Sequence, residues 1–142
     1  RWERQRLFGD LATDLLDGGD FNPAFCITDY SNVTQVQTGR LCSGGGDTGL
    51  PDLQGSAEVI NAQRQYIAAL IALGTDGFRL DAAKHMTLDH VNAVFDPALI
   101  GGRPVFGEII TGGGRGNTEY EIFLKPWMAQ TPLSAYDFPL FH

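Results

Sequence analysis

Apolar positions in the second half of this chain recur at helical spacing over three stretches. The first stretch predicts a long helix that Ser56 caps and Gly74 ends, with its apolar side at Val59, Ile60, Ile67, Leu70 and Ile71. Two further helices are predicted, one over 87–97 that Thr87 caps and one over 119–124 that ends before Pro126.

Short apolar runs between these helices predict strands at 76–81, 104–110 and 134–138. Helices that alternate with strands favour a parallel sheet with right-handed crossovers. Each run contains a carboxylate near its end, at nearly equal intervals along the chain: Asp81, Glu108 and Asp137. Units of this size are typical of a (β/α)8 barrel or of a doubly wound sheet, so the predicted fold class is α/β.

The first 55 residues differ in composition from the rest of the chain. Clusters of Gly, Asp, Asn and Pro at 17–23, 44–47 and 50–53 predict turns and loops, and only 4–16 has a weak helical pattern. We therefore predict two units, a loop-rich segment over 1–55 and an α/β segment over 56–142.

Composition narrows the classes of function. The 142 residues have a formal charge of −7 and are 43% hydrophobic, which is enough for a packed core. The acidic balance argues against a nucleic-acid partner, because phosphate binding needs a basic surface. No run reaches the ~20 apolar residues of a membrane span. The chain begins at Arg1 without a methionine, so we expect a segment of a longer protein and draw nothing from the missing leader.

The two cysteines, Cys26 and Cys42, lie in the loop-rich segment. They can close a loop of about 15 residues, which would stabilise the fold by roughly 3 kcal/mol. Two free thiols are the alternative, and the spacing fits no zinc site.

The predicted strand ends carry the candidate chemistry. Asp81 and Glu108 are expected at the C-terminal ends of neighbouring strands, where parallel α/β folds form their sites. Two carboxylates there suit glycoside cleavage, in which one attacks the sugar and the other protonates the leaving oxygen. Arg79 shares a face with Asp81 and is expected to keep it ionised, whereas apolar neighbours are expected to keep Glu108 protonated. The alternative is that both carboxylates are surface groups paired with Lys84 and Arg103.

Four segments, in the right order, resemble signature motifs of the alpha-amylase family of glycoside hydrolases. The run from Gly77 to His85 (GFRLDAAKH) is similar to the strand that carries the nucleophile, and 105–108 (VFGE) to the next signature. The segments 29–37 and 50–53 are similar to parts of the inserted domain B that hold calcium.

The resemblance implies a role for each matched residue. Asp81 matches the nucleophile, Glu108 the general acid/base, and Arg79 the arginine that holds the nucleophile and in some members binds chloride. Lys84 and His85 match residues that line the sugar subsites. The matched calcium ligands are Asp52 and the backbone carbonyls of Gln37 and His85. Cys26 and Cys42 match a disulfide of animal-type alpha-amylases, with Cys42 slightly displaced from its position there.

The resemblance further implies a secreted, monomeric, calcium-dependent alpha-amylase that cleaves α-1,4 bonds of starch and glycogen with retention. By its register the chain holds part of domain B and about strands four to six of a (β/α)8 barrel. The third catalytic aspartate lies outside it, so we expect the isolated chain to be inactive. An α-glucosidase or transglycosylase of the same family, and a non-catalytic glucan- or calcium-binding remnant, are the alternatives.

Overall fold

The computed structural model describes residues 18–136 and contains helices and strands in alternation. The predicted helix over 4–16 and the end of the predicted third strand lie outside the described residues. In chain order the elements are η2 (Gly18–Asp20), α1 (Val33–Thr38), α2 (Ala57–Ala72), β1 (Phe78–Leu80), η3 (Ala83–His85), α3 (Leu88–Val94), α4 (Pro97–Ile100), β2 (Val105–Gly107), η4 (Tyr120–Leu124), α5 (Lys125–Gln130) and β3 (Ser134–Ala135).

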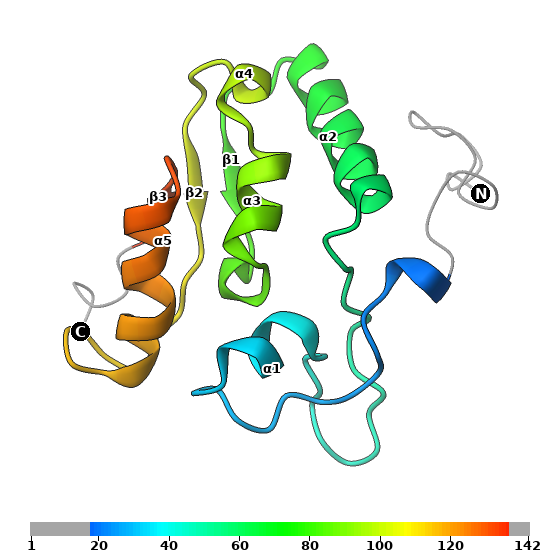
Figure 1. The fold of residues 1–142 in the computed structure, drawn as a ribbon. Helices are drawn as coiled ribbons and strands as arrows, with labels where there is room; N and C mark the ends of the chain where they lie inside the picture. Colours follow the sequence, from blue (N-terminus) through cyan, green and yellow to red (C-terminus); the bar gives the residue numbers. More distant parts are fainter. Residues whose placement is uncertain (1–17, 137–142) are drawn as a thin grey trace.

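The strands form one parallel sheet in the order β1-β2-β3, as the alternation of helices and strands predicts (Figure 1). The register places Leu80 opposite Gly107, and Gly107 opposite Ala135. The α/β class and the parallel sheet are therefore confirmed. The assignment of these strands to positions four to six of an eight-stranded barrel stays a prediction.

Local hydrogen bonds explain where the predicted helices begin. The Ser56 side chain accepts from the Val59 N–H at 3.2 Å, and the Thr87 side chain accepts from the His90 N–H at 3.3 Å. Each bond satisfies one N–H that the first turn of a helix leaves without a partner. Both predicted N-caps are confirmed.

The predicted end of the third helix before Pro126 is wrong. The chain passes from the π-helical turn η4 directly into α5, which contains Pro126 in its first turn. In the π turn the Lys125 N–H donates to the Tyr120 carbonyl, five residues back. Pro126 then occupies one of the first positions of α5, where a missing N–H costs little.

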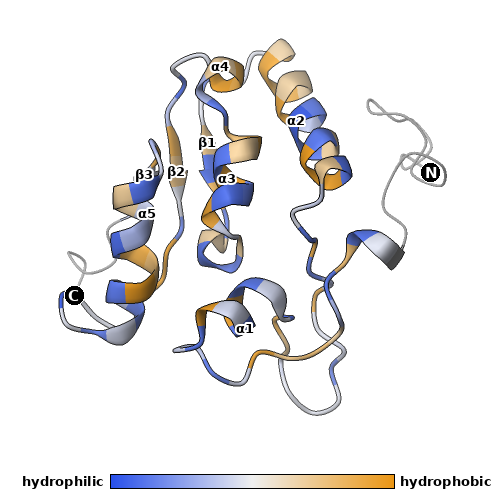
Figure 2. Cartoon of the chain, in the orientation of Figure 1, coloured by the Kyte–Doolittle hydropathy of each residue, from blue (hydrophilic) through white to orange (hydrophobic). Residues whose placement is uncertain are grey.

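The core lies between the sheet and the helices that follow its strands. Figure 2 shows hydrophobic residues along β2 and on parts of α2, α4 and α5. Trp127 and Ile109 are the largest side chains that are fully buried. The other buried members of the core are Val36, Ile67, Ala83, Val91, Val94, Phe95, Ile100, Val105, Phe123, Leu124 and Leu133.

The described part of the loop-rich segment lies at the C-terminal ends of β1 and β2, where α1 contacts η3 (Figure 1). Cys26 and Cys42 form a disulfide, and a parallel bridge joins Cys26 to Arg40 beside it. The disulfide closes the loop that contains α1, so this helix is tied at both ends. The predicted division of the chain at residue 55 stays a prediction. Within residues 18–136, no helix is long and apolar enough to cross a membrane.

Candidate active site

The alternation of side chains along β1 separates the core from the candidate site. Phe78 and Leu80 pack against the core, whereas Arg79, between them, is exposed. Asp81 follows Leu80, and Glu108 follows Gly107, which is opposite Leu80 in the sheet. Because successive residues of a strand point to opposite faces, Arg79 and both carboxylates lie on the face that the core does not use.

One guanidinium joins the two carboxylates. Arg79 donates through Nη1 to Asp81 Oδ1 at 2.7 Å and through Nη2 to Glu108 Oε1 at 2.6 Å. The bond to Asp81, together with the charge of Glu108, raises the pKa of Arg79. The expectation that Glu108 lies in apolar surroundings without a cation is wrong, because the strand register brings it within reach of the same arginine that holds Asp81.

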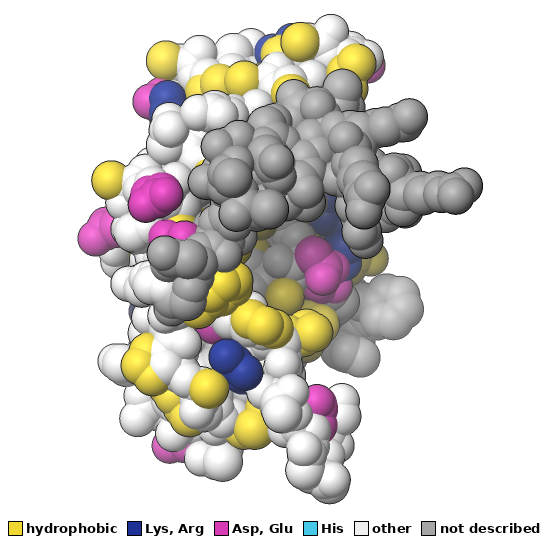
Figure 3. All heavy atoms as spheres, turned by 90° about the vertical axis from the view of Figure 1, so that its right-hand side faces the viewer, with side chains coloured by type: hydrophobic (Ala, Val, Ile, Leu, Met, Phe, Trp, Pro, Cys, Tyr) yellow, Lys and Arg dark blue, Asp and Glu magenta, His cyan; other side chains and the backbone are white. Residues whose placement is uncertain are grey.

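The group is open to solvent to different degrees. The side chains of Asp81, Arg79 and Glu108 are 74%, 50% and 18% exposed. Figure 3 shows a hollow on the face at the right of Figure 1, with acidic and basic side chains close together in it. An exposed carboxylate beside a more enclosed one is a suitable arrangement for a site that admits a polar substrate.

Ala82 adopts a left-handed backbone conformation that could not be predicted from the sequence. Its φ of 47° and ψ of 37° are left-handed, and it is the only residue other than glycine with positive φ among residues 18–136. This turn directs the Ala82 N–H to Glu108 Oε2 at 3.1 Å, while the Ala83 N–H donates to the Glu108 carbonyl at 3.0 Å. The loop after Asp81 therefore holds Glu108 directly. Alanine rarely adopts this conformation, so no sequence signal marks it.

Lys84 points into the protein. Its side chain is 10% exposed, and its ammonium donates to the Ile110 carbonyl at 2.9 Å and to Glu119 Oε2 at 3.4 Å. The ring of Tyr30 lies 5.0 Å from the ammonium and that of Phe123 lies 5.8 Å away. The predicted contact of Lys84 with sugar stays a prediction.

His85 lies between α1 and the candidate site. Its Nδ1 donates to the Val36 carbonyl at 3.1 Å, because a carbonyl oxygen can only accept, so Nε2 is the free nitrogen of the neutral ring. Burial lowers the pKa of His85. The half-exposed ring of Tyr30 meets the imidazole edge-on at 6.2 Å. Sequence reasoning missed Tyr30 as a candidate contact, and only its place in the segment 29–37 could have drawn attention to it.

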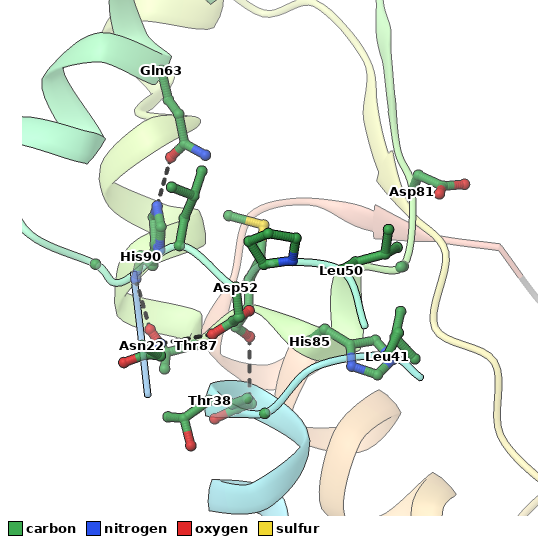
Figure 4. Close-up of a pocket in the computed structure, with 17 residues that line it drawn as sticks. Asn22, Thr38, Leu41, Leu50, Asp52, Gln63, Asp81, His85, Thr87 and His90 are labelled. Atoms are coloured by element: carbon green, nitrogen blue, oxygen red, sulfur yellow. Dashed lines mark hydrogen bonds between the residues drawn. The ribbon is translucent and has the colours of Figure 1, made fainter. Parts of the chain in front are cut away.

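The predicted metal ligands line one cavity. Asp52, Gln37 and His85 surround a space of about 360 Å³ between the loop-rich segment and η3 (Figure 4). Asp81 lies at the edge of this cavity, and its carboxylate points away from Asp52 (Figure 4).

The Asp52 carboxylate has room for a cation. It is partly buried, it accepts from Asn22 Nδ2 at 2.7 Å, and no cationic side chain among residues 18–136 is paired with it. Burial raises the pKa of Asp52. The described residues contain no cluster of three His, Cys, Asp or Glu side chains, so backbone carbonyls would have to supply further ligands, as predicted. Oxygen ligands of this kind suit calcium.

The proteins that are similar to this chain in sequence include alpha-amylases. No protein-family model matches the chain. An alpha-amylase from Aeromonas hydrophila is 53% identical over 140 residues, which are 99% of this chain and 30% of the relative. A second alpha-amylase from the same species is 38% identical over 67% of this chain and 20% of its own length. The chain thus spans less than a third of the relatives it matches.

The solved structures that resemble this chain include alpha-amylases and a glucanotransferase. A cyclomaltodextrin glucanotransferase, CldA, superposes with a TM-score of 0.72 at 27% identity, over 96% of this chain and 26% of its own. A variant of alpha-amylase I from Eisenia fetida in complex with maltohexaose has a TM-score of 0.60 at 29% identity, over 74% of this chain and 24% of its own. An alpha-amylase from Malbranchea cinnamomea, with a TM-score of 0.68 at 23% identity over 89% of this chain and 24% of its own, shares the fold.

Proposed function

Because this chain is a homologue of alpha-amylases along nearly its whole length, we propose that it is part of an enzyme that hydrolyses α-1,4-glucosidic bonds in starch and glycogen. The observation that carries the proposal is the pair of carboxylates, Asp81 and Glu108, held by one arginine at the ends of adjacent parallel strands. Maltohexaose in the Eisenia fetida structure supports a chain of glucose units as the substrate.

In this proposal the two carboxylates divide the work. Asp81 attacks the anomeric carbon, and Glu108 gives its proton to the leaving oxygen, which yields a glycosyl ester on Asp81 and a free sugar end. Glu108 then removes a proton from water, whose oxygen attacks the same carbon and releases Asp81. Retaining enzymes place their carboxyl groups about 5–5.5 Å apart. Two carboxylates bonded to one guanidinium are compatible with that separation.

Arg79 has a distinct part in the sequence of steps. Its bond to Asp81 keeps the nucleophile oriented. Its bond to Glu108 occupies the Oε1 atom of the proposed acid, so this contact must weaken when substrate enters. A sugar that occupies the space between the carboxylates would displace the guanidinium from Glu108 and leave it on Asp81. His85 and Tyr30, beside this space, are the proposed sugar contacts from the loops.

We further propose a calcium ion in the cavity beside the site. Asp52 would hold it through its carboxylate, and Gln37 and His85 through their backbone carbonyls. Bound there, calcium would stabilise the contact between the loop-rich segment and the loop that carries Asp81. Chloride at Arg79 stays a prediction; in this structure both terminal nitrogens of Arg79 donate to carboxylates.

A transglycosylase is the second candidate. The similarity in fold to the glucanotransferase CldA favours it, because the same covalent intermediate can be released by a sugar hydroxyl instead of water. Product analysis separates the two: a hydrolase forms new reducing ends in proportion to the bonds cleaved, whereas a transferase forms few. In either case the disulfide supports a secreted enzyme, because such bonds persist in oxidising compartments.

The test uses the full-length protein that contains this chain. Asp81→Asn and Glu108→Gln should each reduce starch hydrolysis by at least about 10²–10⁴-fold, the range for loss of a group that acts in the chemical step. Asp76→Asn is the matched control, because this exposed carboxylate precedes the same strand at its other end. Near-normal turnover by Asp81→Asn would remove Asp81 as the nucleophile and with it the proposed mechanism.

A further inference from the structure

Two hydrogen bonds cross between α1 and η3, where the loop-rich segment meets the loop that follows Asp81. Gln37 Nε2 donates to the Met86 carbonyl at 3.2 Å. His85 Nδ1 donates to the Val36 carbonyl at 3.1 Å. Each bond runs from a side chain to the backbone of the residue beside the other donor. The pair therefore sets both the distance and the rotation of α1 relative to η3.

Packing alone does not fix α1 in place. Val36 is fully buried and anchors the helix at one point. A cavity of about 150 Å³ nevertheless lies between α1 and the run of η4 and α5, and its walls include Val33, Phe123 and Trp127. Well-packed protein interiors contain few voids of this size. The helix thus has room to shift, and its position depends on the two directional bonds as well as on side-chain packing.

The bond from Gln37 to Met86 lies between two cavities of different character. Both residues line the mainly apolar cavity just described. Both also line the cavity of about 360 Å³ that contains Asp52 and His85 (Figure 4). If this bond were lost, α1 could move toward the apolar cavity, and the wall of the cavity proposed for calcium would move with it.

Such a movement would displace two of the proposed calcium ligands. Gln37 is the second-last residue of α1, and His85 is the last residue of η3. Carbonyls at helix ends lack the N–H partner that a longer helix supplies, so they are available to a cation. Calcium ligands lie about 2.3–2.6 Å from the ion, so the separation of the two carbonyls decides whether both can bind it.

We propose that Gln37 is a positioning residue for calcium. Through its bond to Met86, its side chain fixes α1 against η3 and so holds the carbonyls of Gln37 and His85 at the separation that the ion requires. The inference rests on the calcium ion of the proposed function and adds a part for a side-chain amide that does not itself bind the ion. Groups that orient metal ligands typically contribute about 10–100-fold to metal affinity.

The experiment compares Gln37→Met with Gln35→Met in the full-length protein. Methionine keeps the length of the side chain but has no N–H to donate. Gln35 is the matched control, because it lies on the same helix and its Oε1 accepts from the N–H groups of Thr28 and Asp29 rather than from η3. Titration calorimetry on protein freed of calcium with EDTA gives the Kd of calcium. Thermal unfolding is measured with and without calcium.

If Gln37 positions the ligands, Gln37→Met should raise the Kd of calcium by about tenfold or more. The rise in Tm on adding calcium should shrink accordingly. Gln35→Met should lower Tm in EDTA but keep the Kd within about twofold of the parent, because its bonds are independent of the ligands. If Gln37→Met yields no folded protein, Gln37→Asn carries the same test, since its amide is one methylene too short to reach Met86.

Two results would overturn the inference and leave calcium at Asp52 in place. One is an unchanged Kd in Gln37→Met. The other is an equal rise of Kd in Gln37→Met and Gln35→Met, because general loosening of α1 would then explain both. A parent that binds no calcium would refute the proposed ion and the inference with it. A loss of affinity in Gln37→Met alone supports the inference even if the parent cleaves no α-glucan, a result that would refute the proposed hydrolysis instead.

Discussion

The indole ring of Trp127 packs directly against the backbone of Gly107. Trp127 is 1% exposed, and its Nε1 donates to the Ser134 carbonyl at 3.1 Å, which ties α5 to β3. A Cβ atom on Gly107 would lie 2.5 Å from one ring carbon and 3.0 Å from the Ala83 Cβ. Only glycine leaves room for this contact, one residue before Glu108.

Gly107→Ala should therefore destabilise the protein. The added methyl group must displace a buried indole, and overpacking of this kind costs about 1–3 kcal/mol. Urea unfolding of the full-length protein measures the change. Gly113→Ala is the control, because its Cβ would lie 3.4 Å from its nearest neighbour, at ordinary contact distance. Equal stability of the two variants would show that the core yields to the extra methyl group.

Ala82→Gly should stabilise the protein. A residue with a Cβ atom is destabilised by about 1–2 kcal/mol in the left-handed conformation, and glycine is not. Part of this gain is offset because glycine loses more conformational entropy than alanine on folding. We expect a net gain of about 0.5–1 kcal/mol. Ala82→Val should have the opposite effect, because a β-branched side chain disfavours this conformation. A lower unfolding free energy for Ala82→Gly would mean that the Ala82 methyl group contributes packing that outweighs the strain.

Calcium should raise the melting temperature of the protein, and Asp52→Asn should remove this response. A ligand at a hundredfold excess over its Kd stabilises the folded state by about 2.7 kcal/mol. Without calcium, Asp52→Asn should cost little, because it replaces a carboxylate that burial disfavours in its charged form. Asp47→Asn is the matched control: this exposed carboxylate lies in the same segment and bonds the nearby residues Ser43 and Gly49. If both variants respond to calcium like the parent, Asp52 is not a ligand.

His90 should make the protein sensitive to acid. The ring is 5% exposed, its Nε2 lies 2.6 Å from Gln63 Oε1 between α3 and α2, and burial lowers the pKa of His90. The unfolded chain therefore takes up a proton first as the pH falls below about 6.5, and the free energy of unfolding decreases. The decrease ends once the pH passes the folded-state pKa.

Denaturant unfolding between about pH 8 and pH 5 measures this effect. His90→Gln, which cannot titrate, should lose less stability over this interval than the parent. His85 titrates in both proteins, so it does not enter the difference. Parallel pH dependence of the two proteins would show that His90 is charged as readily in the folded protein as in the unfolded chain.

The spacing of apolar residues was sufficient to predict the strands and helices that carry the candidate site. The apolar runs placed Asp81 and Glu108 at the ends of parallel strands, and Ser56 and Thr87 were recognised as helix caps because the capping bond is local. The bond from Arg79 to Glu108 was not predictable in this way, because it depends on the register between two strands. The inward direction of Lys84 depends on partners as distant in sequence as Glu119.

The errors have local physical causes. Proline usually ends a helix, yet Pro126 lies just after a π turn, at the start of a new α-helical segment where no N–H is required. Ala82 gave no signal because left-handed backbone is typical of glycine and asparagine. In both cases tertiary contacts, around Trp127 and around Glu108, stabilise a local conformation that the residue type does not favour.

The π turn at Tyr120–Leu124 also sets the rotation of everything that follows it. Each α-helical residue advances about 100° around the axis, so deleting one residue from this turn would swing the indole of Trp127 away from the strand beneath it. Related proteins that keep a tryptophan against this glycine should therefore keep the number of residues between the start of this turn and the tryptophan. Insertions and deletions in this helix should occur after the tryptophan.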